Sequence, residues 1–119
     1  MITFKEEFCR DHTFKQRYEE SAKVISRFPD KIPVIVYERD NSLKLDKHKF
    51  LVPRDLTCAQ LLFVIRKRLD STIHAEKALF IGCKDTIVQG NIMLFDIYDT
   101  YKDPDGFLYV SLFSENTFG

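Results

Sequence analysis

The feature of this chain that most limits its fold is one capped helical segment, 57–70, which lies between two groups of β-rich runs. Thr57 followed by Gln60 is a capping-box pattern, and this pattern marks the start of a helix. Leu61 and Ile65 then fall four positions apart, on a stripe that must face a core. One helix that packs on a face of a sheet predicts an α+β fold.

The β-rich runs have the length and composition of strands. They are KIPVIVYE (31–38), KHKFLVP (47–53), ALFIGC (78–83) and the alternating run FLYVSLF (107–113). The first two are joined by a short polar connection and predict a hairpin. The sequence DPDG before the last run has the Pro and Gly positions of a type I turn. In the last run, Leu108, Val110 and Leu112 form the predicted core face.

Helical patterns also occur outside the central segment. Thr13 with Gln16 predicts a capped helix over 14–28, FKEEFC (4–9) predicts a short helical turn, and NIMLFDIYDTY (91–101) predicts a short helix. A first hairpin, a crossing helix and a last strand that returns to the sheet centre describe a ubiquitin-like β-grasp. We therefore expect a four-stranded mixed sheet with a crossing helix and two N-terminal helices.

The element order also predicts how one domain is organised. Residues 1–30 form a helical extension packed on the core, residues 31–113 form the β-grasp core, and residues 114–119 form a flexible tail. Phe107 points to the opposite face of the sheet from Leu108, so another element must cover its side chain on that face. The helix over 14–28 is expected to do so and to leave a gap for a ligand.

The charges balance overall but not along the chain. Residues 44–68 carry seven Lys or Arg and two Asp, a net charge of +5, whereas residues 69–119 have a net charge of −5. A basic segment in a neutral domain favours an acidic peptide as partner, although a solvated helix face explains it equally well. Nucleic acid is not expected, because Phe50 and Phe63 are the only aromatic residues in the basic segment.

Neither a metal site nor a catalytic site is predicted. Cys9, Cys58 and Cys83 are widely spaced, lack a CxxC pattern and are expected to be reduced core thiols, so no cofactor is expected. Four aspartates between 96 and 105 are interpreted as a helix face and a turn, and not as an acid–base pair. No apolar stretch reaches 18 residues and no signal peptide is recognised, so we expect a soluble cytoplasmic domain.

The last residues, SENTFG, cannot build a core. A frayed terminus explains their polarity but not the glycine at position 119. Glycine lacks a Cβ atom, so its carboxylate can approach an enzyme closely and pass through a narrow channel. A terminal glycine at position 119 is therefore suited to reaction of its carboxylate in a narrow enzyme channel.

At four separated motifs the chain resembles the autophagy-related ubiquitin-like modifiers, the GABARAP and microtubule-associated light-chain-three group. The motifs are KIPVIVYE, LDKHKFLVPRDLT, VIRKRL and DGFLYV with ENTFG, and the resemblance covers Thr13 to Gly119. It implies conjugation of Gly119 to phosphatidylethanolamine, with Phe118 recognised in the tail. It also implies activating and conjugating enzymes, a processing cysteine protease, and a place in the cytoplasm and on autophagosomal membranes. The alternative is an unconjugated trafficking or cytoskeletal adaptor of the same fold.

The resemblance further implies a groove for aromatic-x-x-aliphatic peptides along the edge strand 47–53. The pocket for the aromatic side chain is predicted to contain Glu20, Val24, Pro33, Ile35, Lys49, Leu51 and Phe107. The pocket for the aliphatic side chain is predicted to contain Phe50, Val52, Pro53, Leu61, Val64, Ile65 and Arg68. Lys47 lies on the rim. Plain core packing is the competing explanation for Ile35, Leu61 and Ile65, and protection of the edge against aggregation for the lysines.

Three features depart from the family pattern. The connection 39–46 is shorter than usual and lacks a proline, Gly82 replaces a bulky strand residue, and Leu112-Phe113 replaces a more polar pair. A glycine within a strand is expected to weaken it by roughly 0.5–1 kcal/mol relative to alanine.

Overall fold

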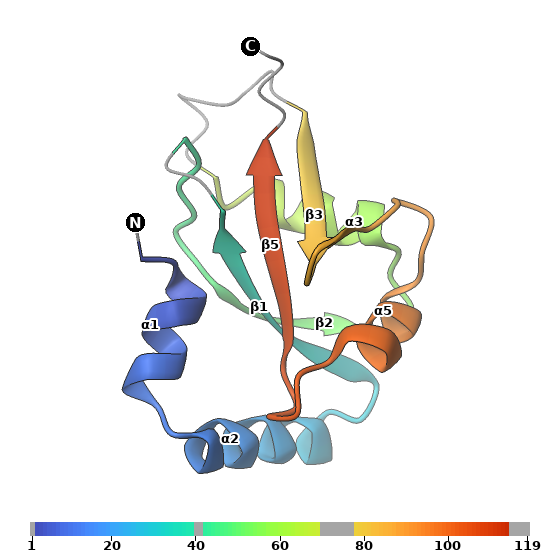
Figure 1. The fold of residues 1–119 in the computed structure, drawn as a ribbon. Helices are drawn as coiled ribbons and strands as arrows, with labels where there is room; N and C mark the ends of the chain where they lie inside the picture. The colour runs from blue at the N-terminus through green and yellow to red at the C-terminus, as the bar shows by residue number, and fades with distance from the viewer. Residues whose placement is uncertain (1, 40–41, 70–77, 115–119) are drawn as a thin grey trace.

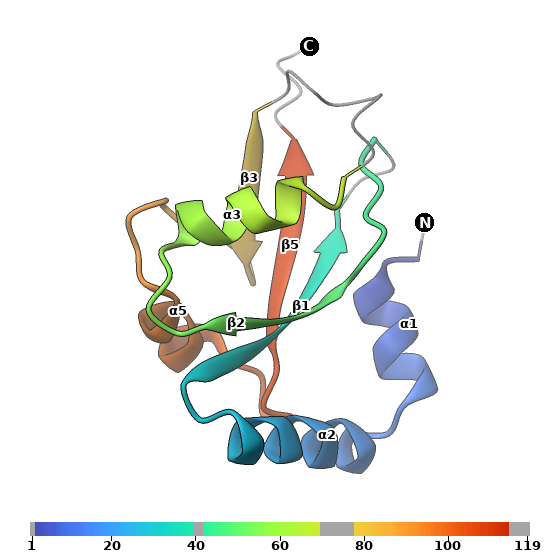
Figure 2. The ribbon, with the colours of Figure 1, turned by 180° about the vertical axis from the view of Figure 1, so that it is seen from behind.

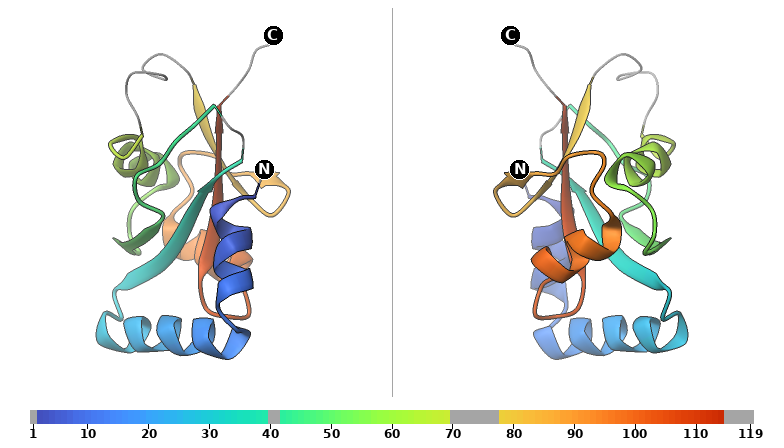
Figure 3. Two further views of the ribbon diagram at one scale, coloured as in Figure 1. Left: turned by 90° about the vertical axis from the view of Figure 1, so that its left-hand side faces the viewer. Right: turned by 90° about the vertical axis from the view of Figure 1, so that its right-hand side faces the viewer.

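The fold consists of one mixed sheet with helices on both of its faces (Figure 1). The computed structural model describes residues 2–39, 42–69 and 78–114. The elements in chain order are α1 (Phe4–Asp11), α2 (Phe14–Arg27), β1 (Lys31–Glu38), β2 (Lys49–Pro53), α3 (Cys58–Arg66), β3 (Leu79–Cys83), β4 (Thr86–Ile87), α5 (Leu94–Tyr101) and β5 (Leu108–Ser114). Seen from behind, α3 crosses the sheet while α2 lies below it (Figure 2). In edge-on views α1 and α3 lie on opposite faces (Figure 3).

The strand order is β2-β1-β5-β3-β4, which confirms the predicted β-grasp. β1 and β2 form the antiparallel hairpin, and β5 returns to the centre of the sheet, parallel to β1 and antiparallel to β3. A fifth strand adds to the four that were predicted. This strand, β4, has two residues and follows the turn at Lys84-Asp85, where Lys84 has a φ of 54°.

Capping boxes begin three helices, one more than predicted. Those at Thr13 and Thr57 are confirmed, and a third joins Thr3 to Glu6. This third box begins α1, which is longer than the short helical turn predicted over 4–9 and, with α2, confirms the expected pair of N-terminal helices. Each side-chain cap stabilises its helix by about 1 kcal/mol. The Thr-x-x-Glu pattern that marks α1 was present in the sequence.

The central helix is shorter than predicted, because α3 ends at Arg66. Tighter backbone bonds follow, from the Arg68 N–H to Ile65 and from the Leu69 N–H to Arg66. Leu69 then pairs with Leu45 in an isolated β-bridge, and both side chains are buried. This pairing draws the chain away from the helix axis and fixes the described part of the connection 39–46.

Two apolar clusters lie on the two faces of the sheet. The larger one joins the predicted core face of β5 to α3 and α5. The smaller one consists of Phe8, Ile35, Phe107 and Tyr109. The sequence predicted that the helix over 14–28 covers Phe107. Instead Phe8 of α1 meets the Phe107 ring edge-on, with ring centroids 5.6 Å apart.

A buried polar network connects α2 to the start of β5. The Asp105 side chain is 0% exposed and accepts hydrogen bonds from Arg17 Nε (2.9 Å), the Tyr109 hydroxyl (2.6 Å) and the Phe107 N–H (2.9 Å). Burial and this bond to Asp105 raise the pKa of Tyr109 far above its usual value. Asp105 lies in the predicted turn, but its burial and its partners were not predicted.

The turn itself also approaches α2 closely. Gly106 has a φ of +92°, and a Cβ atom on it would lie 2.2 Å from Ser21 Oγ. The Ser21 hydroxyl donates to the Asp105 carbonyl. Both the left-handed conformation and the close approach require glycine at this position.

Two of the departures from the family pattern meet in space. A Cβ atom on Gly82 would lie 3.4 Å from the Phe113 ring, 3.4 Å from the Arg39 guanidinium and 2.8 Å from Ser111 Oγ. Phe113 also stacks against Phe80, and Arg39 lies 4.4 Å from the centroid of the Phe113 ring. The missing side chain at position 82 therefore makes room for the larger side chain at position 113.

The three cysteines are free thiols. Burial raises the pKa of Cys58 to about 11 and that of Cys83 to about 12, so both are protonated and unreactive at neutral pH. Within the described ranges, no group of three or more potential ligands is placed to hold a metal ion. No helix among the described residues has the length and apolar character needed to cross a membrane.

Candidate functional site

The candidate site lies along β2, which is the edge strand that the sequence predicts. β2 pairs with β1 on one side only. The Val36 N–H donates to the His48 carbonyl, and backbone pairing alternates along an antiparallel strand. The backbone groups of Lys49 and Leu51 are therefore directed away from β1. They are free to pair with an added strand.

Pro33 fits this arrangement although it lies in an interior strand. It sits opposite Leu51, where the alternation directs backbone groups away from β2. Its other neighbour would be β5, but pairing of β1 with β5 begins one residue later, at Val34 and Leu108. No ladder bond is lost through the missing N–H.

The predicted aromatic pocket lies on the face of the sheet that carries α1 and α2. Register places Leu51 opposite Pro33 and Lys49 opposite Ile35, on the same face as Phe107. Lys49 Nζ lies 3.0 Å from Glu20 Oε2. Val24, which is half-buried, follows Glu20 by one helical turn. The structure therefore brings together the residues predicted for this pocket.

The residues predicted for the base of this pocket are buried in the structure. Ile35 is 0% exposed and Phe107 is 3% exposed, and the Lys49–Glu20 ion pair lies at the surface beside them. Lys49 Nζ is also 4.8 Å from the centroid of the Phe8 ring. A side chain that entered between α2 and β2 would therefore have to displace the lysine. Because both partners of the ion pair are substantially exposed, opening it costs at most about 1 kcal/mol.

The predicted aliphatic pocket lies on the opposite face, against α3. Four of its seven residues are core side chains of the larger cluster: Phe50, Val52, Leu61 and Ile65. Val64 is half-buried against that cluster, whereas Pro53 and Arg68 are exposed. The accessible part of this pocket is therefore its rim, where Lys47 Nζ also lies 5.0 Å from the centroid of the Phe50 ring.

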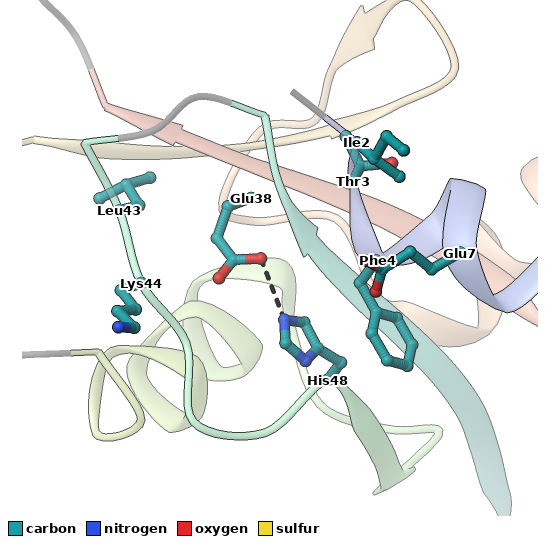
Figure 4. A pocket seen from close by; sticks show the side chains of 8 residues that line it. All are labelled: Ile2, Thr3, Phe4, Glu7, Glu38, Leu43, Lys44 and His48. Carbon is teal, nitrogen blue, oxygen red and sulfur yellow. Dashed lines mark hydrogen bonds and ion pairs between the residues drawn. The ribbon is translucent and has the colours of Figure 1, made fainter.

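A second group of residues beside β2 was not predicted. The Phe4 and His48 rings stack with centroids 4.3 Å apart, and His48 Nε2 lies 3.0 Å from Glu38 Oε1 (Figure 4). The Leu45 N–H donates to the second oxygen of Glu38. Burial would raise the pKa of Glu38, but these two hydrogen bonds outweigh it and lower the pKa. The group connects α1 to the hairpin at the start of β2.

These residues border a cavity of about 250 Å³ between α1 and the hairpin, which Ile2, Glu7, Leu43 and Lys44 also line. Figure 4 shows their side chains converging from α1 and from the connection before β2. Sequence reasoning missed them because no local pattern links residue 4 to residue 48.

The tail residues Phe118 and Gly119 lie outside the described residues. β5 continues to Ser114, one residue beyond the predicted core boundary, and its arrow in Figure 1 points away from α2.

Comparisons with known proteins agree on one family. Residues 16–119 match the family model described as "Autophagy protein Atg8 ubiquitin like". Autophagy-related protein 8c of Arabidopsis thaliana is 45% identical over 114 residues, 94% of each chain. Autophagy-related protein 8 of Candida albicans is 43% identical over 117 residues, 97% of this chain and 85% of that protein.

Solved structures share the fold. The crystal structure of Trypanosoma brucei ATG8 superposes with a TM-score of 0.80 at 43% identity and covers 94% of this chain and 97% of that one. Plasmodium falciparum Atg8, solved in complex with an Atg3 peptide, superposes with a TM-score of 0.74 at 24% identity over 89% of this chain and 96% of that one. At that identity the second similarity supports the fold alone.

Proposed function

The chain belongs to the Atg8 family of ubiquitin-like autophagy proteins, and we propose that it is a modifier with two separable activities. Its Gly119 carboxylate is conjugated to phosphatidylethanolamine on autophagic membranes. Its β2 edge recruits cargo receptors and autophagy factors through aromatic-x-x-aliphatic peptides. The chain has no catalytic role of its own, because separate enzymes activate, conjugate and process it.

One observation carries the proposal for the groove: the two candidate pockets lie on opposite faces of the sheet, on either side of a free edge. Side chains alternate between faces along a strand. In a peptide added to β2, the aromatic residue and the aliphatic residue three positions later therefore point to opposite faces. A spacing of two or four would direct both to the same face.

Charge favours peptides with acidic flanks. Lys47, which precedes β2, and Lys49, which begins it, are both exposed, and the ammonium of Lys49 is already paired with the Glu20 carboxylate. An acidic residue of the peptide can replace Glu20 as the partner of Lys49. This exchange uncovers the aromatic pocket while it keeps the lysine paired, so the acidic flank promotes both attraction and opening.

The proposal for the tail is supported by the match to the family, which extends to residue 119. We keep the division into an N-terminal extension (1–30), a core (31–113) and a tail (114–119), with Phe118 as the recognised tail residue. Phosphatidylethanolamine supplies two acyl chains, and two chains anchor a protein stably where one does so only marginally. The protein would then move from the cytoplasm to the autophagosomal membrane.

Reconstitution with the cognate activating and conjugating enzymes, ATP and liposomes containing phosphatidylethanolamine tests both activities. We expect deletion of Gly119 to abolish the lipid adduct, read by gel shift and flotation, and to leave peptide affinity unchanged in calorimetry. Leu51→Ala should be conjugated normally. Its peptide binding should be weaker by about 1–3 kcal/mol, which is the usual cost of removing a buried anchor side chain. Phe63→Ser, which alters an exposed residue of α3, is the matched control and should change neither.

The outcomes separate the alternatives. An adduct formed by the chain without Gly119 would show that the tail has another purpose. A wild-type chain that binds the peptide but is never conjugated would identify the unconjugated adaptor. Normal peptide binding by Leu51→Ala would refute the position of the groove.

A further inference from the structure

A second hollow lies at the opposite edge of the sheet from β2, between β4 and α5. Its volume is about 310 Å³. The side chains that matter for its chemistry are Ile87, Ile92, Asp96, Ile97, Thr100 and Tyr101. In Figure 1 the orange segment that leads from β3 to α5 lies on the right-hand side, and β4 forms the edge of the sheet opposite β2.

The wall of this hollow is held rigidly. The Cys58 N–H donates to the Ile92 carbonyl at 2.8 Å, and the Ala59 N–H donates to the Gly90 carbonyl at 3.0 Å. These donors belong to the first turn of α3, whose N–H groups have no partner within the helix. Gly90 packs so closely that a Cβ atom on it would lie 3.3 Å from the Ala59 Cβ. The hollow is preformed, and binding there does not require the loop to become ordered first.

Its apolar wall is accessible to solvent. Ile87 is 60% exposed and Ile92 is 36% exposed, and both line the same hollow. Single exposed apolar side chains are common, but two that converge on a concave surface mark an interaction site. β4 is also an edge strand, so its outer side has no strand partner among the described residues.

The charge of the hollow is negative, because Asp96 is the one charged side chain among the described residues that line it. Asp96 lines the hollow and makes no ion pair with any residue in the described part of the chain. This charge is opposite to that of the β2 edge, where the exposed charged side chains are those of Lys47 and Lys49.

We propose that this hollow docks an extended segment of a partner protein that carries an aliphatic side chain next to a lysine or arginine. The aliphatic side chain packs between Ile87 and Ile92, and the cation pairs with Asp96. The outer side of β4 offers backbone groups to the segment. This site is independent of the proposed β2 groove, and the two lie on opposite edges of the sheet, so both can be occupied at once.

Nuclear magnetic resonance of the full-length ¹⁵N-labelled chain tests the proposal. The probe is the capped peptide Lys-Val-Lys-Ile-Arg, and the comparison peptide is Glu-Val-Glu-Ile-Glu. We expect saturable shifts of the amides of residues 86–88 and 92–101 with the basic peptide only. Ile87→Ser should weaken binding about 10-fold, as loss of an apolar anchor does. Asp96→Asn should weaken it about 3-fold at low salt and less at high salt.

Matched controls remove similar groups elsewhere. Phe63→Ser changes an apolar residue that is 62% exposed on α3, and Glu19→Gln removes an exposed acid from α2. Neither should alter binding of the basic peptide. Leu51→Ala should not alter it either, which separates this site from the β2 groove.

Three results would overturn the proposal: no saturable shift with the basic peptide, equal binding of the acidic peptide, or shifts that map to β2 and disappear in Leu51→Ala. Ile87 is largely exposed, so its substitution should leave the dispersed spectrum intact. If it does not, Asp96→Asn and the amide map of the wild-type chain still decide the question.

Discussion

Replacing Asp105 by alanine is expected to destabilise the whole domain although the residue lies in a turn. The substitution removes the acceptor shared by Arg17, Tyr109 and the Phe107 N–H. Removing one partner of a buried ion pair costs about 3–5 kcal/mol, because the other charge stays buried. Arg17 keeps the carbonyls of Cys9 and His12 as acceptors, so we expect the low end of that range, about 3 kcal/mol.

Urea unfolding followed by circular dichroism measures this loss. With an m value of about 1.5 kcal/mol/M, the midpoint should fall by about 2 M. Asp99→Ala, which removes an exposed carboxylate from α5, should change stability by less than about 0.5 kcal/mol. Adding Arg17→Met to Asp105→Ala should restore part of the loss, because the unpaired charge is then gone.

A loss below about 1 kcal/mol in Asp105→Ala would refute the network as a main connection between α2 and β5. No recovery in the double variant would show that the unpaired Arg17 charge is not the source of the loss.

Three further predictions follow from contacts near the groove and within the sheet. Glu20→Gln removes the partner of Lys49 and should raise the affinity for an acidic aromatic-x-x-aliphatic peptide by up to about 5-fold in calorimetry. The gain should be smaller at high salt. A decrease in affinity would contradict the proposal that the Lys49–Glu20 ion pair must open before the peptide binds. Glu38 has a lowered pKa, so its contribution to stability is present above its unfolded pKa and lost as pH falls through the folded pKa. Urea titrations from about pH 6 to about pH 3 should therefore show the stability gap between wild type and Glu38→Gln narrowing, and a gap that widens would reverse the assignment. Gly82→Ala places a Cβ atom 2.8 Å from Ser111 Oγ and should lower Tm by about 3–6 °C. Adding Ser111→Ala should restore Tm. An unchanged Tm in Gly82→Ala would show that the strands move apart enough to accept the Cβ atom.

Features set by neighbours in sequence were predictable. The caps at Thr13 and Thr57, the hairpin and the core face of β5 each depend on a few residues close along the chain. The third cap, at Thr3, carried the same local signal and was overlooked. The edge position of β2 followed from the order of the elements, and the assignment of residues to the two pockets came from the resemblance.

Features set by distant residues were not predictable. Alternation shows that Phe107 leaves the core face, but it does not show that Phe8 covers it from α1. Asp105 reads as an ordinary turn residue because its partner Arg17 lies 88 positions away. Gly82 and Phe113 looked like separate departures from a family pattern until the sheet placed them side by side.

The parallel pairing of β1 with β5 affects how the protein is made. This pairing joins Val34 to Leu108, which are 74 positions apart, so the centre of the sheet closes a very long loop. Such non-local pairing makes folding slow, and it requires the last strand to be present. A chain still emerging from the ribosome lacks β5 and exposes the strands that would flank it. The sheet can therefore close only after β5 has been made, and under the proposed function only a chain able to complete its sheet would be presented for conjugation.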